Sequence, residues 1–329
     1  MKDSDQTPVH RLQGLLSDRM EAVNSLIADR MASENAPRIP QVTAHLVGAG
    51  GKRIRPLMVL AAAALYGYRG DNDVKLAATV EFIHTATLLH DDVVDESEQR
   101  RGRPTANLLW DNQSSVLVGD YLFARSFQLM VEAESLRVLD ILANAAAVIA
   151  EGEVLQLSVA RDLTTVEDTY IKVVRGKTAA LFAAASEVGG LVAGASDADV
   201  AALRRYGDAL GIAFQIADDL LDLVGEDIGK NTGDDLREGK LTLPVIRALA
   251  VAQGEERAFW ERLIGKGRFE EGDVERARAI FDRHGIIEGV RESAFDWVAE
   301  AQSALEGLPE GDVRTSLHDL AEFTVARLR

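Results

Sequence analysis

Long segments rich in alanine and leucine, with apolar residues three and four positions apart, constrain the fold of this chain more than any other feature. Along 8–32 these residues fall on one face of a helix, as burial requires, and they are Leu12, Leu15, Leu16, Met20, Val23, Leu26 and Ile27. Aromatic residues make up only 5% of the chain, and alternating β-branched runs are scarce. The period is therefore helical, and the sequence predicts an all-α protein.

Further helices are predicted where the same spacing continues between glycine, proline, asparagine and aspartate residues. They span 57–67, 74–96, 115–132, 136–160, 166–189, 197–224 and 241–252. Helices of more than twenty residues are roughly 30 Å long, so their bundle could enclose a deep central cavity. We expect one domain over 1–329, with its motifs between about 45 and 250. The charged tail from about 253 to 329 is predicted to form two or three helices that serve packing, not chemistry.

The charge balance limits the partners of the chain. It carries 36 basic and 53 acidic residues, a formal net charge of −17, which argues against nucleic acid or an anionic membrane surface as the main partner. Because there is no cysteine, disulfides and thiolate metal sites are excluded. No run of about 18 apolar residues occurs. We therefore expect a soluble, cytoplasmic protein with at most transient contact with the inner face of a membrane.

Two acidic triplets share one spacing, and each lies near the end of an apolar segment. They are Asp91, Asp92 and Asp95, and Asp218, Asp219 and Asp222. On a helix, positions i and i+4 share a face, so the first and third carboxylates of each triplet project in the same direction. The helix dipole and mutual repulsion disfavour such placement, so stability alone does not explain it. Each triplet predicts a clamp for a hard cation, although solvated acidic helix ends remain the alternative when the triplets are taken alone.

Oxygen ligands without cysteine or paired histidines favour Mg²⁺, with Mn²⁺ as a possible substitute. Mg²⁺ characteristically binds few carboxylates together with phosphate oxygens and water, which indicates a diphosphate ligand. Basic residues beside both triplets agree with this: the string RRGR at 100–103 follows the first, and Lys230 and Lys240 follow the second. Arginine and lysine both bind phosphate, the former through planar paired donors.

Two glycine-containing strings add weaker signals. Residues 50–56, GGKRIRP, combine glycines, three basic residues and a proline that opens a helix, which suits the approach of the backbone to an anion. Gly176 interrupts a helical pattern, where glycine is unfavourable, and predicts a kink that turns Lys177 and Thr178 towards the site. An ordinary basic loop and an ordinary kink are the alternatives for these strings.

Together, the motif strings resemble those of the trans-isoprenyl diphosphate synthases, in the same order and at compatible spacing. The strings are GGKRIRP, FIHTATLLHDDVVDESEQRRGRPTAN, GKTAALF and FQIADDLLDLVGEDIGKNTGDDLREGKLTLP. The likeness covers roughly 45–250 and is greatest to the long-chain octaprenyl to decaprenyl synthases of ubiquinone biosynthesis. It implies a helical bundle of the isoprenoid synthase type, a typical homodimer, and condensation of isopentenyl diphosphate onto an allylic diphosphate such as farnesyl diphosphate.

The resemblance also implies roles for individual residues. Asp91, Asp95 and Asp218 match positions that bind the Mg²⁺ ions bridging the allylic diphosphate, with Asp92, Asp219 and Asp222 completing the catalytic set. Positions that face the allylic substrate are Arg100, Lys177, Thr178, Gln215, Lys230 and Lys240. Positions that hold isopentenyl diphosphate are Lys52, Arg55, His84 and Arg101. The implied reaction ionises the allylic diphosphate before condensation, and no side chain stands out as the base that removes the final proton.

Product length depends on the residues that precede Asp91 on its helix. Ala86 lies five residues earlier, about 7.5 Å by helical rise, and Ala86 and Thr87 leave room where an aromatic residue would stop a growing chain. A long product is therefore expected, with Phe127 and Met130 predicted to lie near the floor of the cavity.

Several alternatives remain at this point. Within the family they are a shorter-chain farnesyl or geranylgeranyl synthase and a noncatalytic subunit of a heteromeric synthase, although the latter would be expected to lose carboxylates. A terpene cyclase or a head-to-head condensing synthase also uses acidic motifs in a helical cavity. The pair Glu81 and His84 resembles half of a di-iron site, but no other histidine has a glutamate three residues before it.

Overall fold

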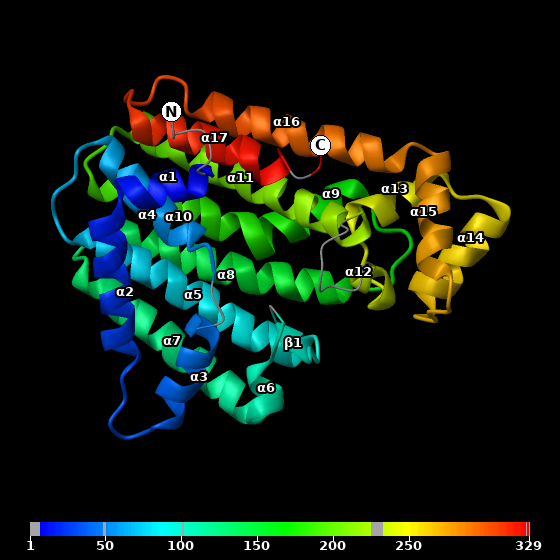
Figure 1. The fold of residues 1–329 in the computed structure, drawn as a ribbon, viewed down its shortest axis with the longest axis horizontal. Helices are drawn as coiled ribbons and strands as arrows, with labels where there is room; N and C mark the ends of the chain where they lie inside the picture. Colours follow the sequence, from blue (N-terminus) through cyan, green and yellow to red (C-terminus); the bar gives the residue numbers. More distant parts are fainter. Residues whose placement is uncertain (1–6, 49–50, 101, 225–232, 327, 329) are drawn as a thin grey trace. The chain divides into compact units, whose positions relative to one another are not determined.

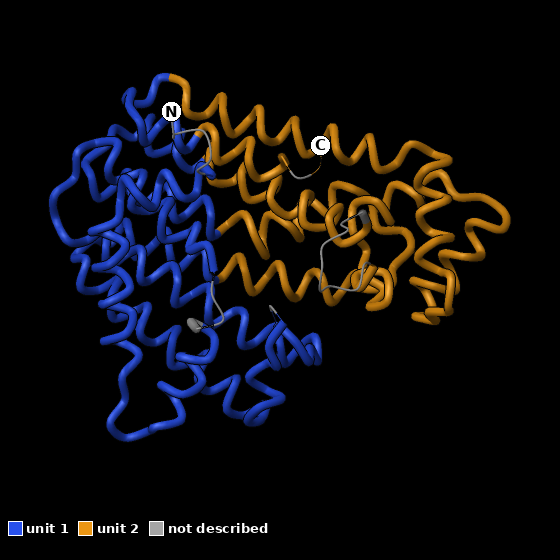
Figure 2. Tube along the Cα trace, viewed as in Figure 1, with its two compact units in different colours: residues 1–146, 181–204, 307–317 blue, residues 147–180, 205–306, 318–329 orange. Residues whose placement is uncertain are grey.

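A computed structural model describes residues 7–48, 51–100, 102–224, 233–326 and 328. Nearly all of the described elements are helices, as the sequence predicts (Figure 1). The contacts divide the chain into two compact units (Figure 2). Unit 1 comprises 1–146, 181–204 and 307–317, and unit 2 comprises 147–180, 205–306 and 318–329. That the two units together form the single domain predicted over 1–329 remains a prediction.

Unit 1 contains the N-terminal elements. They are α1 Pro8–Leu15, α2 Ser17–Met31, α3 Arg38–Gly48, α4 Ile54–Leu65, α5 Asn72–Val94, strands β1 Gln99–Arg100 and β2 Arg103–Pro104, α6 Ala106–Leu109 and α7 Asn112–Glu132. Four helices contribute residues to both units, namely α8 Leu136–Ser158, α10 Ala180–Val192, α11 Asp197–Val224 and α17 Asp312–Ala326.

Unit 2 contains most of the later elements. They are α9 Glu167–Val174, the π-helix η1 Arg175–Ala179, α12 Asp234–Arg237, α13 Leu243–Val251, α14 Gly254–Trp260, the π-helix η2 Glu261–Gly265, α15 Asp273–Arg283 and α16 Ile286–Ala304.

Helix α5 forms the centre of unit 1. It packs against α2, α4 and α7, and its buried positions lie all around the helix, among them Leu76, Val80, Phe82 and Ile83. A helix that is apolar on every side is stable only when other elements surround it. Because α5 is enclosed in this way, the polar residues at its C-terminal end have a fixed support.

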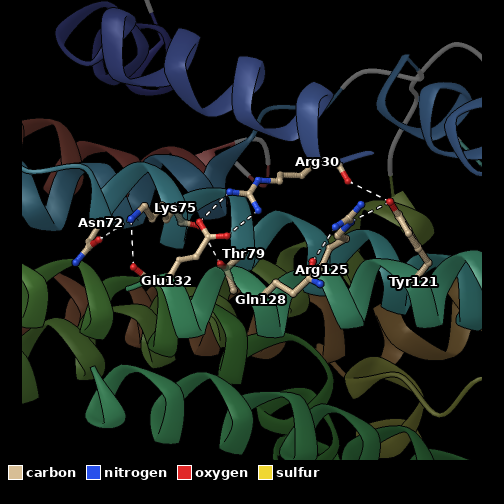
Figure 3. Close-up of polar contacts among 8 residues, drawn as sticks. All are labelled: Arg30, Asn72, Lys75, Thr79, Tyr121, Arg125, Gln128 and Glu132. Atoms are coloured by element: carbon tan, nitrogen blue, oxygen red, sulfur yellow. Dashed lines mark hydrogen bonds and ion pairs between the residues drawn. The ribbon is translucent and has the colours of Figure 1, made fainter. Parts of the chain in front are cut away.

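A polar network joins the C-terminal end of α2 to α7 in unit 1 (Figure 3). The guanidinium of Arg30 binds both carboxylate oxygens of Glu132, at 2.7 and 2.8 Å. The hydroxyl of Tyr121 donates to the carbonyl of Ala32 at 3.1 Å, and Arg125 donates to that hydroxyl at 2.9 Å. Planar paired contacts of this kind fix both position and direction, so the network holds the N-terminal helices against the helix that packs on α5.

The core of unit 2 includes an aromatic cluster in the tail. Trp260 is fully buried, with ring centroids 4.8 Å from Phe259 and 5.7 Å from Phe281. Helix α16 packs against α13 and α15. The tail forms four α-helices, α14 to α17, where the sequence predicts two or three.

Three helix boundaries differ from the prediction for local reasons. The expected helix over 8–32 is divided at Leu16, two residues after the weak helix former Gly14. Helix α3 lies in a segment without a predicted helix, and its Pro40 falls in the first turn, where a proline is tolerated. The expected helix over 166–189 consists of α9, η1 and α10 and continues to Val192.

Within the described ranges, no helix combines the length and the apolar character needed to cross a membrane.

Candidate active site

The first aspartate triplet lies at the C-terminal end of α5, as predicted. Asp91 and Asp92 belong to its last turn, and Asp95 caps the helix, its amide donating to the carbonyl of Asp91 at 2.8 Å. Asp91 is half-buried and Asp95 is exposed, whereas Asp92 is completely buried. The outer two carboxylates are therefore accessible to a ligand, and the middle one points into the protein.

Arg100 holds the buried carboxylate of Asp92. Its Nε and Nη2 atoms lie 2.8 and 2.7 Å from Oδ1 of Asp92. Arg100 is placed by the antiparallel hairpin of β1 and β2, in which Gly102 adopts the left-handed conformation that a tight turn needs. The resemblance assigns Arg100 to the allylic substrate, but in this structure it also compensates the charge of Asp92. No described residue donates to the buried Oδ2 atom of Asp92.

The second triplet lies near the C-terminal end of α11 and repeats this arrangement. Asp218 is exposed, Asp222 is half-buried, and Asp219 is 5% exposed. Neutral donors hold Asp219: the Tyr170 hydroxyl donates to Oδ2 at 2.7 Å, and Gln215 Nε2 donates to Oδ1 at 2.9 Å. Both triplets thus bury the middle aspartate and leave the first one accessible, but their buried carboxylates have different partners.

Burial and repulsion perturb the second triplet. Burial, followed by repulsion from Asp235, raises the pKa of Asp219 to about 7, although the hydrogen bonds from Gln215 and Tyr170 act in the opposite direction. The same two causes raise the pKa of Asp222 to about 6, against the hydrogen bond that its Oδ2 accepts from the amide of Asp235 at 3.2 Å. Burial also raises the pKa of Tyr170 far above its usual range. An added cation would offset this excess of negative charge.

Glycines allow the helices around Lys177 and Thr178 to approach closely. A Cβ on Gly176 would lie 2.8 Å from the Cα of Gly152, and a Cβ on Gly211 would lie 2.5 Å from the Cα of Ala179. In this space the helix forms the π-helix η1 at the glycine where the sequence predicts a kink. Thr178 then donates to the Oε1 atom of Gln215 at 2.9 Å.

Two lysines predicted to face the allylic substrate are paired with acidic residues. The Nζ of Lys177 lies 3.0 Å from the carboxylate of Glu153. The Nζ of Lys240 lies 3.3 Å from Asp235 and 2.5 Å from Glu238. Burial alone would lower the pKa of Lys240, but these carboxylates raise it above its ordinary value. Both lysines are therefore cations held in defined positions.

The structure brings together two of the residues predicted to hold isopentenyl diphosphate. The Nη1 of Arg55 lies 3.3 Å from Nε2 of His84, and the Arg55 guanidinium lies 4.4 Å from the centroid of the Phe182 ring. Lys52 is exposed, and its carbonyl accepts from Gln13 at 3.4 Å. The predicted substrate residues Arg101 and Lys230 lie outside the described residues.

The residues predicted to set product length lie in different environments. Ala86 is fully buried, and Thr87 donates to the carbonyl of His84 at 2.8 Å. Met130 is 1% exposed, whereas Phe127 is 44% exposed and so lies on the outer face of α7. The prediction of a cavity floor on α7 therefore rests on Met130.

The accessible carboxylates of each triplet, taken separately, suit a hard divalent ion. Asp91, Asp95 and Asp218 present accessible carboxylate oxygens, which are ligands that Mg²⁺ accepts. Among the residues that the structure describes, no three acidic or histidine side chains converge on one point to bind an ion by themselves. Mg²⁺ commonly takes most of its ligands from phosphate and water.

The alternative iron site is not supported, since Glu81 pairs with Arg53 and His84 contacts Arg55. Sequence reasoning did not assign Tyr170 or Asp235 to the site. Both act through contacts with the second triplet, and Tyr170 is 49 positions from Asp219, so no local spacing reveals it.

Comparison with known proteins identifies the family. The profile of the polyprenyl synthetase family matches residues 36–281. Octaprenyl diphosphate synthase of Haemophilus influenzae is 42% identical over 329 residues, with 99% of each chain covered. A decaprenyl diphosphate synthase structure from Rhodobacter capsulatus is 63% identical, with a TM-score of 0.95 over 98% of this chain and 99% of that one.

A polyprenyl synthase structure from Caulobacter crescentus, in complex with calcium and isoprenyl diphosphate, is 50% identical, with a TM-score of 0.93 over 100% of both chains. A family profile that covers most of the chain and full-length relatives of this identity agree with the two aspartate triplets. The chain belongs to the polyprenyl synthetase family.

Proposed function

We propose that this prenyltransferase is a long-chain all-trans polyprenyl diphosphate synthase. It adds isopentenyl diphosphate head-to-tail to an allylic diphosphate such as farnesyl diphosphate and gives an octaprenyl to decaprenyl product, for the side chain of ubiquinone. The main support is the repeated arrangement of the aspartate triplets, each with a buried middle carboxylate and an accessible first one. The octaprenyl and decaprenyl synthases among its relatives agree with the product length.

Asp91, Asp95 and Asp218 are proposed to hold Mg²⁺, with Mn²⁺ as a substitute. When bound, these ions offset the charge of the departing diphosphate. The calcium-bound Caulobacter relative supports a divalent ion in this family. Asp92 and Asp219 are proposed to position the accessible carboxylates, because their own oxygens are engaged inside the protein.

The remaining residues divide between the two substrates. Lys177, Thr178, Gln215 and Lys240, with Arg100 and Lys230, are proposed to bind the allylic diphosphate. Lys52, Arg55, His84 and Arg101 are proposed to bind isopentenyl diphosphate; the contact between Arg55 and His84 supports this set. Fixed cations that face a developing diphosphate charge stabilise ionisation.

With both substrates held side by side, the proposed reaction proceeds in three steps. Ionisation breaks the bond between the allylic carbon and its diphosphate oxygen, and the isopentenyl double bond attacks the resulting carbocation. Loss of a proton, for which the released diphosphate is the proposed acceptor, restores an allylic diphosphate longer by one unit. Water must be excluded throughout, because it would convert the cation to an alcohol.

Ala86 is proposed to line the cavity into which the product grows. Its methyl side chain is fully buried and lies about 7.5 Å along α5 from Asp91. An aromatic side chain here would end the cavity early, so Ala86→Tyr should shift the product to farnesyl or geranylgeranyl diphosphate, while Ala86→Ser should leave it long. Full-length product from a folded Ala86→Tyr variant would exclude Ala86 from the cavity.

The reaction itself is tested by sizing its products. Purified protein is incubated with Mg²⁺, farnesyl diphosphate and labelled isopentenyl diphosphate, and the products are dephosphorylated and separated by length. We expect products of eight to ten isoprene units and no incorporation when the metal is chelated. Absence of labelled product would exclude the proposed reaction, and products that end at geranylgeranyl would exclude its long-chain form.

A homodimer is also part of this proposal. Along its length, helix α7 exposes Leu117 and Val131, each 66% exposed, and Phe127, which is unfavourable for an isolated chain. Val131→Asp should convert a dimer into monomers in sedimentation analysis, whereas Leu15→Asp, at an exposed apolar position on α1, should not. Cytoplasmic activity with transient membrane contact during product release completes the proposal.

A further inference from the structure

The tail, which the sequence assigns to packing alone, contacts the backbone of the second aspartate triplet. Arg278 lies on α15, and its Nε and Nη2 atoms donate to the carbonyl of Leu223 at 2.9 and 2.6 Å. Leu223 directly follows Asp222 on α11. A residue 55 positions later in the chain thus binds the end of the helix that presents the triplet.

The end of α11 needs such a partner. The last four carbonyls of a helix accept no hydrogen bond from the amides of that helix, and they carry a partial negative charge. Helix α11 adds Asp218, Asp219 and Asp222 near this end and has no basic residue in its last turn. Arg278 therefore supplies from α15 both the hydrogen bonds and the positive charge that α11 lacks.

A second contact joins α15 to the same region. Gly233 leaves space for Val274 of α15, since a Cβ on Gly233 would lie 2.8 Å from Cγ2 of Val274. The amide of Gly233 donates to the carbonyl of Asp222 at 2.8 Å. Helix α15 thus touches the residue after Asp222 and also the turn that is bonded to Asp222.

Helix α15 is itself anchored at its first residue. Asp273 is 4% exposed and accepts from Arg262 at 2.5 and 2.9 Å and from the amide of Glu270 at 2.7 Å. Buried charged pairs with two contacts fix geometry. The support for Arg278 is therefore rigid.

We propose that Arg278 is a positioning residue for the second aspartate triplet, and that α15 holds the last turn of α11 in the arrangement that metal-diphosphate binding requires. This inference rests on the proposed function. Arg278 touches no substrate in this account; it acts through the carbonyl of Leu223 and hence through the direction of Asp222 and Asp218.

The metal requirement distinguishes positioning from simple charge balance. If Arg278 acted only as a nearby positive charge, its removal would strengthen the binding of a cation. If it fixes the last turn, its removal frees that turn and weakens binding. The two roles predict opposite shifts in the Mg²⁺ concentration that gives half-maximal activity.

Arg278→Met is compared with Arg276→Met, which removes the same charge from the same helix; Arg276 stacks on Phe259 at 4.8 Å. We expect Arg278→Met to raise the Mg²⁺ requirement and to lower kcat by about tenfold each, as loss of an outer partner of a metal ligand commonly does. Arg278→Lys, which keeps the charge but loses the paired donors, should fall between Arg278→Met and the wild type.

Hydrogen exchange of the metal-free protein provides a readout that does not depend on activity. In Arg278→Met the amides of residues 220–224 should exchange faster than in the wild type, while those at the start of α11 should not change. The proposal would be overturned if Arg278→Met had the same exchange rates and the same Mg²⁺ requirement as Arg276→Met. A lowered Mg²⁺ requirement in Arg278→Met would also overturn it. A wild-type protein without prenyl transfer would instead exclude the proposed function, and the exchange rates would still decide the role of Arg278.

Discussion

The two aspartate triplets both bury the middle carboxylate, but they support it differently. In the first, the buried Asp92 is paired with the cation Arg100. In the second, the buried Asp219 accepts from the neutral side chains of Tyr170 and Gln215, and Asp235 repels it. A charged partner compensates a buried carboxylate directly, whereas neutral donors leave its pKa raised. The first triplet therefore depends on one ion pair, and the second depends on several weaker contacts.

The largest expected effect comes from removing the ion pair of the first triplet. Arg100→Met leaves the buried carboxylate of Asp92 without its partner, which should lower the free energy of unfolding by about 3 kcal/mol. Product formation should fall at least about a hundredfold, because Asp91 and Asp95 lose their support. Urea unfolding and incorporation of labelled isopentenyl diphosphate measure the two effects.

Arg103→Met is the control for this change, since Arg103 is the exposed neighbour of Arg100 across the hairpin. It should change stability by less than about 0.5 kcal/mol. An equal loss of stability in Arg100→Met and Arg103→Met would show that the buried carboxylate of Asp92 does not need Arg100 as its partner.

The equivalent aspartates should respond differently to the same substitution. Asp92→Asn removes the charge that Arg100 binds, and we expect it to lower the free energy of unfolding by about 2 kcal/mol more than Asp219→Asn does. Asp219 has a pKa of about 7, so it loses little when it becomes a neutral amide. Denaturant midpoints at pH 7 without metal provide the comparison, and a larger loss for Asp219→Asn would contradict it.

The raised pKa of Asp219 should also appear in the pH dependence of stability. Its folded pKa of about 7 exceeds its ordinary value of 3.8, so the folded state binds the extra proton between these values. Binding of this proton adds to the free energy of unfolding. The added stability is complete below the ordinary pKa of the carboxyl, and it falls as the pH rises towards the folded pKa of about 7, by at most about 1.4 kcal/mol per pH unit. Without metal, Asp219→Asn should flatten the stability profile between about pH 5 and 7 relative to wild type. If the stability profiles of the wild type and Asp219→Asn were parallel over this pH range, the pKa of Asp219 would not be raised.

The smallest expected effect comes from one neutral donor of the second triplet. Tyr170→Phe removes the 2.7 Å hydrogen bond to Asp219 but leaves that of Gln215, so it should lower the free energy of unfolding by about 1 kcal/mol. We expect a loss of activity of several-fold, with a raised Mg²⁺ requirement. Tyr206→Phe, at a buried position nearer the start of α11, the helix that carries Asp219, should keep the wild-type Mg²⁺ requirement. The same requirement in both variants would separate Tyr170 from the metal site.

Local spacing was sufficient to predict most of the helices and the placement of both aspartate triplets near helix ends. Helical period places Asp91 and Asp95 on one face, and Gly176, where a kink was predicted, lies in a π-helix. Helix α3 was not predicted, and its third residue is Pro40, which is tolerated in a first turn.

The supports of the triplets depend on tertiary contacts and left no local signal. Tyr170 reaches Asp219, and Arg278 reaches Leu223, only because separate helices pack together. Likewise, Gly152 and Gly176 lie on two different helices, and their close approach appears only when these helices pack together. The sequence therefore predicts which residues face the substrates, but it gives no signal for the residues that hold them in place.

A crystal structure with Mn²⁺ and a non-ionisable analogue of an allylic diphosphate tests the central claim most directly, because anomalous scattering locates the metal. We predict that Asp91, Asp95 and Asp218 ligate the ions, while Asp92 keeps Arg100 and Asp219 keeps Tyr170 and Gln215. Ions bound by Asp92 or Asp219, or no ion at either triplet, would contradict the division between accessible ligands and buried positioning residues.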